Sequence, residues 1–400
     1  MSIDAAAERL ARFLEEQRYV EVYGHHDADG VVAASIICHA LRKRGIGFRL
    51  RVVDRVPDLD GGAPALLCDL GAGLEDLPSD VAVLDHHAPV ARGDGAVLNP
   101  HAVGLDGERV LCAAALAFLV ANRFADCRDL AGLAVAGMLG DGQAFEGENA
   151  EILNDGLANG VIELAQGIRL PGTTIGEQLE LAIDPFLPGI SGNADRVREL
   201  LRASMGEDGP ELDRLLSLIV LDTVRDAAPG AIEALWGDRV VCLREVLADA
   251  TTLSAVVDAC GKSGRGGLAA SVCLRSPGAV EEARKVAAGY RRRVIGAIAG
   301  ARPVGESTCA VLIDDPALVG DVATALAGPA GGPVLVAARN GDMVRVSTRA
   351  DGAVPLGPLV RQLASEAGGS GGGHARRAGG SVPADGFLGF AAAFAEAVGA

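Results

Sequence analysis

Short apolar runs alternate with helical patterns over the first 165 residues, and this alternation limits the fold more than any other feature. It is typical of a parallel sheet covered by helices. We therefore expect an α/β domain that binds its ligands at the carboxyl edge of the sheet, where loops follow the strands. The sequence predicts strands at Tyr19–Gly24, Phe48–Val53, Ala65–Leu70 and Val81–Leu84, and helices at Val31–Arg44, Val110–Asn122 and Leu130–Leu139.

The rest of the chain divides into two further regions. Residues 166–243 contain a rigid break, Asp184-Pro185-Phe186-Leu187-Pro188-Gly189, among patterns rich in Leu and Arg, which predicts a helical connector. From residue 244 a second α/β unit is expected, and the glycine run from Gly368 to Gly373 is too glycine-rich for a core element. This unit is predicted to contain a long helix, Ala279–Ala299, and strands at Leu268–Leu274, Ala310–Ile313, Val334–Ala337 and Met343–Thr348. The expected parts are thus a catalytic domain, 1–165, a connector, 166–243, and a substrate-binding domain, 244–400.

The composition indicates a soluble, cytoplasmic protein. The longest uncharged apolar stretch, Leu111 to Ala121, is too short to span a bilayer. The eight cysteines are scattered, without the spacing of a zinc or redox motif, so we expect buried free thiols. A net charge of −17 does not exclude a nucleic-acid partner, because phosphates interact with the groove they enter. Only 3% of the residues are aromatic, so recognition would depend on phosphate, backbone-amide and sugar contacts rather than base stacking.

Four of the seven histidines lie in two tight clusters with aspartates. The clusters are His25-His26-Asp27-Ala28-Asp29 and Asp85-His86-His87, and both follow predicted strands. Asp69, which also ends a predicted strand, and Asp141 complete the set. Imidazole and carboxylate ligands without thiolate suit Mn²⁺ or Mg²⁺, with Co²⁺ or Zn²⁺ as alternatives. Two ions about 4 Å apart need six or more side-chain ligands, one of them bridging, and this sequence contains enough.

Each of these residues also has a simpler interpretation. Asp141 lies in a Gly-Asp-Gly turn sequence, and Asp27 or Asp29 is well placed to cap the helix that begins near Val31. A His-His pair is usually a surface or capping feature. Several such coincidences at strand ends would be needed together, so the metal-binding interpretation is favoured.

The motifs resemble those of the DHH phosphoesterases, a family named after the triplet Asp85-His86-His87. His25-x-Asp27-x-Asp29-Gly30 resembles the first motif of that family, Asp69 the second and Gly140-Asp141 the fourth. Gly372-Gly373-His374, followed by Ala378-Gly379-Gly380, resembles the glycine-rich motif of the DHH-associated C-terminal domain. The stretch from Asp184 to Asn193 is similar to archaeal RecJ-like single-strand exonucleases. The resemblance covers nearly the whole chain.

This resemblance implies a role for each site residue. His25 and Asp27 would hold one ion, Asp29, His86 and Asp141 the other, and Asp69 would bridge the two. Asp85 would orient a histidine, and His87 would face the scissile phosphate. His101, in the family-like segment Leu98-Asn99-Pro100-His101, would have either a structural role or a phosphate contact. The expected substrate-binding residues are His101, Arg349, Gly372, Gly373, His374, Arg376 and Arg377.

The substrate-binding prediction has physical support in the sequence as well. Glycines let backbone N–H groups approach a phosphate, and arginines pair with it. Arg345, Ser347 and Arg349 alternate along a predicted strand and would share one face. The alternative is that the glycine run is a flexible surface loop.

The sequence leaves three functions open. The first is a two-metal exonuclease that activates a hydroxide and releases mononucleotides from single-stranded DNA or RNA, with 5′-to-3′ polarity favoured by the resemblance and a role in DNA repair or replication. The second is a phosphoesterase that acts on small molecules, short oligonucleotides or cyclic dinucleotides. The third is a component of a replication complex that binds archaeal GINS.

Overall fold

The computed structural model describes residues 2–59, 62–89, 96–207, 209–224, 232–305, 307–330, 332–350 and 354–399. The chain forms two compact units, and neither is continuous in sequence. The first consists of residues 1–167 and 238–288, and the second of residues 168–237 and 289–400. Residues 238–288 therefore belong with the first unit. From the sequence we expected a C-terminal domain that contains all residues from 244 onward.

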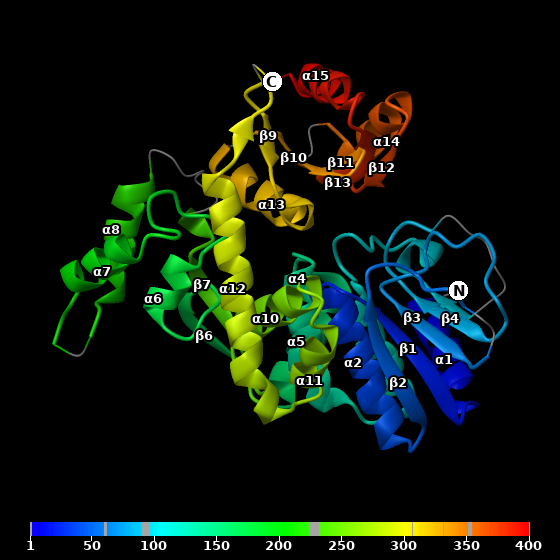
Figure 1. Ribbon diagram of the computed structural model, residues 1–400. Coiled ribbons are helices and arrows are strands. Elements are labelled where there is room, and N and C mark those ends of the chain that lie inside the picture. The colour runs from blue at the N-terminus through cyan, green and yellow to red at the C-terminus, as the bar shows by residue number, and fades with distance from the viewer. Residues whose placement is uncertain are drawn as a thin grey trace. The chain divides into compact units, whose positions relative to one another are not determined.

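The first unit contains a parallel five-stranded sheet with the strand order β2-β1-β3-β4-β5 (Figure 1). The predicted strands are confirmed, and β5 is added at the edge. Helix α2 is buried along almost its whole length and packs against β1, α3, α4 and α10. The strands are β1 Tyr19–His25, β2 Gly47–Val53, β3 Ala65–Cys68, β4 Val81–Leu84 and β5 Ala96–Leu98. The helices are α1 Ile3–Glu15, α2 Ala28–Lys43, α3 Ala113–Phe124, α4 Ala131–Gly140, α5 Gly147–Ala158, α10 Ala250–Lys262 and α11 Gly266–Cys273, with 3-10 turns η1 Pro100–Val103 and η2 Arg128–Leu130.

Two glycines allow β1 to turn directly into α2. A Cβ atom on Gly24 would lie 2.7 Å from the carbonyl oxygen of Gly30, and one on Gly30 would lie 2.5 Å from His25 Cβ. The carboxylate of Asp27 accepts a hydrogen bond from Gly30 N at 2.9 Å and caps α2. This turn fixes the backbone that carries His25, Asp27 and Asp29.

The second unit contains a six-stranded sheet with the strand order β12-β13-β11-β10-β9-β8. β9 and β10 are parallel, and the other pairs are antiparallel. Its buried core includes Leu335, Val360, Phe390 and Phe394. The strands are β8 Arg302–Pro303, β9 Ala310–Ile313, β10 Val334–Asn340, β11 Met343–Arg349, β12 Ser370–Gly373 and β13 Arg377–Pro383. The accompanying helices are α13 Val319–Ala330, α14 Leu356–Glu366 and α15 Phe387–Val398, with the 3-10 turn η4 Pro316–Leu318.

The region predicted as a connector is only partly helical. Helices α6 Ile175–Glu180, α7 Ala194–Ala203 and α8 Leu212–Thr223 surround a small apolar core that includes Leu179, Leu187 and Leu215. This region begins and ends in a two-stranded sheet of β6 Ile162–Ile168 and β7 Trp236–Cys242. The predicted long helix is confirmed as α12 Val280–Ala299, preceded by η3 Pro277–Ala279.

One local prediction was wrong, and one alternative is excluded. The predicted strand Leu268–Leu274 forms helix α11 up to Cys273, with Leu274 as the C-cap. A short apolar run does not distinguish a strand from a buried helix, and Ala269 and Ala270 favour the helix. The glycine run is not a loop but contains strand β12, which pairs with β13. A Cβ atom on Gly380 would lie 2.5 Å from Ser370 O, so glycine permits this close pairing.

The eight cysteines are all buried and unpaired, as expected. Within the described ranges, no helix is both long and apolar enough to cross a membrane.

Candidate metal centre and substrate pocket

The polar clusters meet at the carboxyl edge of the parallel sheet. His25 is the last residue of β1, Asp69 follows β3, and Asp85, His86 and His87 follow β4. These three strands are neighbours in the sheet. Asp69 has a left-handed backbone (φ 59°), a conformation that aspartate tolerates better than most residues. Its N–H donates to Leu84 O at 2.8 Å, which links the end of β3 to the end of β4.

Asp69 belongs to two groups of side chains, each compact enough to hold a cation. His25, Asp27 and Asp69 form the first group, and Asp69, His86 and His87 form the second. His25 Nδ1 lies 2.8 Å from Asp27 Oδ2 and 3.3 Å from Asp69 Oδ2. On the other side of the same carboxylate, Asp69 Oδ1 lies 3.3 Å from His86 Nε2. A shared carboxylate of this kind is what a two-cation centre requires.

Three carboxylates converge on one nitrogen of His86. Besides Asp69, the nearest oxygens are Asp29 Oδ2 at 3.8 Å and Asp141 Oδ2 at 3.9 Å. The other ring nitrogen, Nδ1, lies 2.7 Å from Gly107 O, a group that can only accept a hydrogen bond. Nδ1 therefore carries a proton, and Nε2 is the ring atom that faces the carboxylates, as in histidine ligands of metals.

The carboxylate of Asp29 is held by the N-terminus of another helix. Its two oxygens accept hydrogen bonds from Ala113 N and Ala114 N, each at 2.8 Å, at the start of α3. The capping interpretation of this acidic pair therefore has a structural basis, because Asp27 caps α2 and Asp29 binds the N-terminus of α3. Each carboxylate oxygen has two lone pairs, and these hydrogen bonds leave some of them unused, so both carboxylates remain capable of binding a cation.

Asp85 and His87 form a close pair, and His87 also belongs to the second group, with Nδ1 3.6 Å from Asp69 Oδ1. Asp85 Oδ1 lies 2.8 Å from His87 Nδ1 and also accepts the His87 backbone N–H at 3.1 Å. Asp85 Oδ2 accepts from Ala72 N at 2.8 Å, and the carboxylate is buried. The imidazole of His87 is 44% exposed, so its orientation is set from the protein side while the ring faces solvent.

The electrostatics of the site fit divalent cations. Burial alone would lower the pKa of His25, but the carboxylates of Asp27 and Asp69 raise it to about 11. The pKa of His86 is raised in the same way, despite burial, by Asp69, Asp141 and Asp29. Burial and the charge of Asp69 raise the pKa of Asp29. Among the described residues, the buried His25 Nδ1 and Asp69 Oδ1 lack a partner with hydrogen-bond geometry. The ligand atoms of the site are thus nitrogen and carboxylate oxygen, without sulfur, and the carboxylates are negatively charged. This combination suits Mn²⁺ or Mg²⁺.

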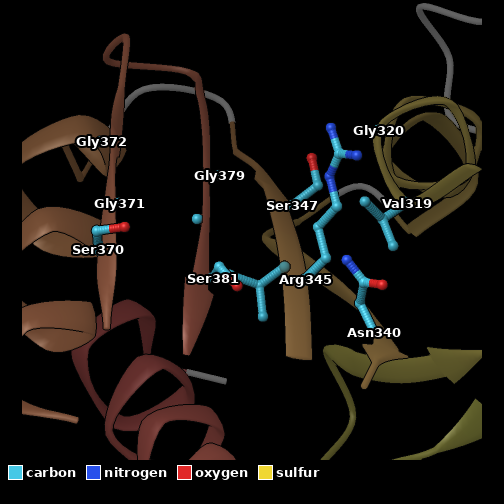
Figure 2. Close-up of a pocket in the computed structure, with 12 residues that line it drawn as sticks. Val319, Gly320, Asn340, Arg345, Ser347, Ser370, Gly371, Gly372, Gly379 and Ser381 are labelled. Carbon is cyan, nitrogen blue, oxygen red and sulfur yellow. The ribbon is translucent and has the colours of Figure 1, made fainter. Parts of the chain in front are cut away.

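The second unit contains a pocket of about 680 Å³ on its sheet. Figure 2 shows the side chain of Arg345 extending past Ser347, with Ser370 and Ser381 on the strands beside them. Glycines of β12 and β13, including Gly372, complete the lining and expose backbone. The pocket therefore combines one cation, several hydroxyls and accessible backbone, which is suited to an anionic ligand.

Most of the predicted substrate-binding residues do not line this pocket. Of these residues, only Gly372 lines the pocket. The Arg349 guanidinium donates to Thr324 Oγ1 and Ser347 Oγ, each at 3.0 Å, and to Gly320 O at 3.1 Å, so it is committed to internal contacts. Gly373, His374, Arg376 and Arg377 lie at the connection from β12 to β13 and are absent from the lining.

In the first unit, the buried Nε2 of His101 has no hydrogen-bond partner within the described chain, and a Cβ on Gly107 would lie 3.1 Å from it.

Several residues that complete these sites were missed. Gln143 donates to Asp141 Oδ2 at 2.9 Å, and Asn99 donates to His87 O at 2.8 Å. Asn99 lies in the quoted segment Leu98-Asn99-Pro100-His101, which was a signal that could have identified it. Gln143 has no comparable signal, because nothing in its local sequence separates it from a surface glutamine.

The chain is similar to known proteins in both of its units. Residues 308–400 match the DHHA1 domain family. An uncharacterised protein from Methanocaldococcus jannaschii is 25% identical over 94% of this chain and 92% of its own length. The single-stranded-DNA-specific exonuclease RecJ of Bacillus subtilis is 25% identical over 54% of this chain and 31% of its own length. The crystal structure of Thermus thermophilus RecJ with Mn²⁺ has the same fold, with a TM-score of 0.64 and 19% identity over 98% of this chain. This chain spans 53% of the length of that RecJ structure.

Proposed function

We propose that this chain, a DHH-family protein with the fold of RecJ, is a metal-dependent phosphodiesterase that removes mononucleotides from one end of single-stranded DNA or RNA. The observation that carries the proposal is the position of Asp69, which belongs to two adjacent groups of potential metal ligands. Relatives named as RecJ support a nuclease, and one of them is named as specific for single-stranded DNA.

The proposed metal ligands follow from the convergence of the side chains. His25 and Asp27 would hold one cation, Asp29, His86 and Asp141 the second, and Asp69 would contact both. Two divalent cations, Mn²⁺ or Mg²⁺, would lower the pKa of an attacking water and neutralise charge on the phosphate oxygens. Mn²⁺ and Mg²⁺ are also the ions named in solved RecJ structures, which supports this choice.

His87 is proposed to contact the phosphate undergoing cleavage. Because Asp85 accepts from its Nδ1, the proton on that nitrogen is held, and the exposed side of the ring carries Nε2. Burial would raise the pKa of Asp85, but the hydrogen bond from His87 lowers it below its ordinary value. The ionised carboxylate in turn stabilises a protonated His87, which can donate to a phosphate oxygen. Asp85 is therefore a positioning residue for His87.

The pocket of the second unit is proposed to bind a phosphate of the nucleic-acid strand. Arg345 would supply the charge, and the hydroxyls of Ser347, Ser370 and Ser381 would donate hydrogen bonds. Arg349 already donates to Ser347 Oγ, so this hydroxyl retains its own proton for a ligand oxygen. Arg349 would thus act through Ser347 and not contact the strand itself.

The two alternative functions remain distinguishable from this proposal. A phosphoesterase for cyclic dinucleotides or other small substrates would use the same metal centre but would not prefer a long strand. A replication component that binds GINS would not need the intact set of ligands around Asp69. The complete ligand set favours an enzyme, and the RecJ relatives favour the strand as substrate.

A side-by-side digestion separates these functions. End-labelled single-stranded DNA, single-stranded RNA and a cyclic dinucleotide would be incubated with wild-type protein and Mn²⁺, with Asp69→Asn as the inactive control. The proposal expects mononucleotide products from a strand and slower turnover of the cyclic dinucleotide. Faster turnover of the cyclic dinucleotide would favour the second function, and no hydrolysis of any substrate would favour the third.

A further inference from the structure

Gln143 is connected to two of the side chains that would bind the second cation. Its Nε2 donates to Asp141 Oδ2 at 2.9 Å and to Gly107 O at 2.7 Å. The same Gly107 carbonyl accepts the Nδ1 proton of His86 at 2.7 Å. A single buried amide thus contacts one proposed ligand directly and the hydrogen-bond acceptor of the other.

The orientation of this amide is fixed by its neighbours. Asn149 Nδ2 donates to Gln143 Oε1 at 2.9 Å and to Ala144 O at 3.0 Å. Because the carbonyls of Gly107 and Ala144 can only accept hydrogen bonds, the nitrogen of each amide must face them. Gln143 Nε2 therefore has both protons engaged, one toward Asp141 and one toward Gly107, and the opposite orientation would break all of these bonds.

The chain segment around Gly107 is packed tightly enough to transmit this orientation. A Cβ atom on Gly107 would lie 2.3 Å from His86 O and 2.8 Å from Pro100 Cγ. Gln143 is 6% exposed, and Asn149 is fully buried, so water competes little for these bonds. A displacement of the Gly107 carbonyl would move the partner that holds the His86 ring.

We infer that Gln143 is a positioning residue that fixes Asp141 and His86 together as ligands of one cation. Its two N–H groups hold the Asp141 carboxylate and the Gly107 carbonyl, and this carbonyl accepts from Nδ1 of His86 and so directs Nε2 toward the proposed ion. The inference rests on the proposed function, because it assigns Asp141 and His86 to the same ion. Outer hydrogen-bond partners of metal ligands typically contribute 10–100-fold to metal affinity.

The test is Mn²⁺ binding by isothermal titration calorimetry of metal-stripped protein, without nucleic acid. Gln143→Leu removes both N–H groups at nearly constant volume. We expect one of two Mn²⁺ ions to bind about 10–100-fold more weakly and the other to bind within twofold of wild type. If Gln143→Leu does not fold, Gln143→Met provides a more flexible side chain for the same measurement.

Gln178 offers a matched control in the second unit. It is also 6% exposed, and its Nε2 donates to a backbone carbonyl, Leu170 O, at 2.8 Å. Because a buried amide is lost in each variant, Gln178→Leu should lower the melting temperature by an amount similar to that of Gln143→Leu. Gln178→Leu should leave both Mn²⁺ affinities unchanged, because Gln178 contacts none of the proposed ligands. A purely structural role for Gln143 would give the same result for Gln143→Leu.

The outcomes separate the inference from the proposed function. If wild-type protein binds no Mn²⁺, the proposed function fails. If wild type binds two ions and Gln143→Leu binds both within twofold, or loses both equally, the positioning role is refuted while the proposed function stands.

Discussion

The Nδ1 atom of His87 lies 2.8 Å from Asp85 Oδ1 and 3.6 Å from Asp69 Oδ1, whereas three carboxylates lie near Nε2 of His86. The two neighbouring histidines therefore both lie near Asp69 but differ in the group that holds Nδ1. His86 is held by a backbone carbonyl with Nε2 toward the acidic groups, whereas His87 is held by a carboxylate with its ring exposed.

We predict that His87→Ala lowers kcat by about 100-fold or more while Mn²⁺ content stays at the wild-type level. A group that donates to the phosphate in the transition state contributes to kcat, whereas a metal ligand contributes to metal content. Steady-state kinetics with metal analysis of the same samples would check this. Loss of one Mn²⁺ equivalent in His87→Ala would show that His87 is a ligand.

Arg345→Ala should raise KM for long single strands about five- to tenfold, because one charge-assisted contact to phosphate is lost. The dependence of binding on salt should also weaken by about one phosphate contact. Arg339→Ala is the control, because Arg339 is exposed at the end of the neighbouring strand β10 and does not line the pocket. Fluorescence anisotropy at several salt concentrations gives both quantities. Equal effects of the two substitutions would mean that the pocket does not bind the strand.

Gly380→Ala should reduce strand binding and destabilise the second unit by roughly 1–3 kcal/mol, because the new Cβ would lie 2.5 Å from Ser370 O. Mn²⁺ content should not change. Gly389→Ala in helix α15 is the matched control, since a Cβ there meets nothing within 4 Å and should be neutral or slightly stabilising. Thermal melting compares the two. A Gly380→Ala variant as stable as wild type would indicate that β12 and β13 are not paired closely.

The outcome for the glycine run illustrates which parts of the fold the sequence predicts. Strands β1 to β4 of the first sheet and the long helix α12 were predictable because their apolar patterns are strong and are bounded by polar turns. Strand β12 was not, because glycines carry no side-chain pattern and act only through close backbone contacts. Helix α11 was missed for a related reason, since a short run of Ala, Val and Cys has no clear period.

In the candidate site, too, some residues could be identified from the sequence and others could not. The proposed metal ligands were identifiable because His and Asp clusters at strand ends are unusual combinations. Gln143 was not selected, because its role depends on contacts with residues distant in sequence, such as Gly107. Arg345 was noted only for its alternation with Ser347 and Arg349, because its pocket also needs the distant strands β12 and β13. Arg349 was selected from its alternation with Ser347, but burial directs it to internal acceptors.

His39 should make the first unit less stable in mild acid. Burial and the cations Arg275 and Arg42 lower the pKa of His39 to about 4, while the ring contacts Cys273 O and Arg42, with Asp129 nearby. The unfolded chain, with an ordinary histidine pKa near 6.5, binds the proton more readily, so stability falls as the pH drops from above 6.5 toward 4.

The expected loss from this residue is about 2 kcal/mol between pH 7.5 and pH 5. Chemical denaturation of wild type and His39→Gln at both pH values would isolate the contribution, because the other titrating groups are common to the two proteins. Parallel pH dependences for the two proteins would show that His39 is not the group responsible.

The most direct test of the two-cation centre is the number of Mn²⁺ ions bound per chain, measured by equilibrium dialysis of wild type and Asp69→Asn. Asparagine preserves the side-chain shape and tolerates the left-handed backbone of residue 69, so only the shared charge is removed. We predict two ions for wild type and at least tenfold weaker binding of both ions in Asp69→Asn. One ion or none in wild type, or two ions bound with unchanged affinity in Asp69→Asn, would contradict a centre bridged by Asp69.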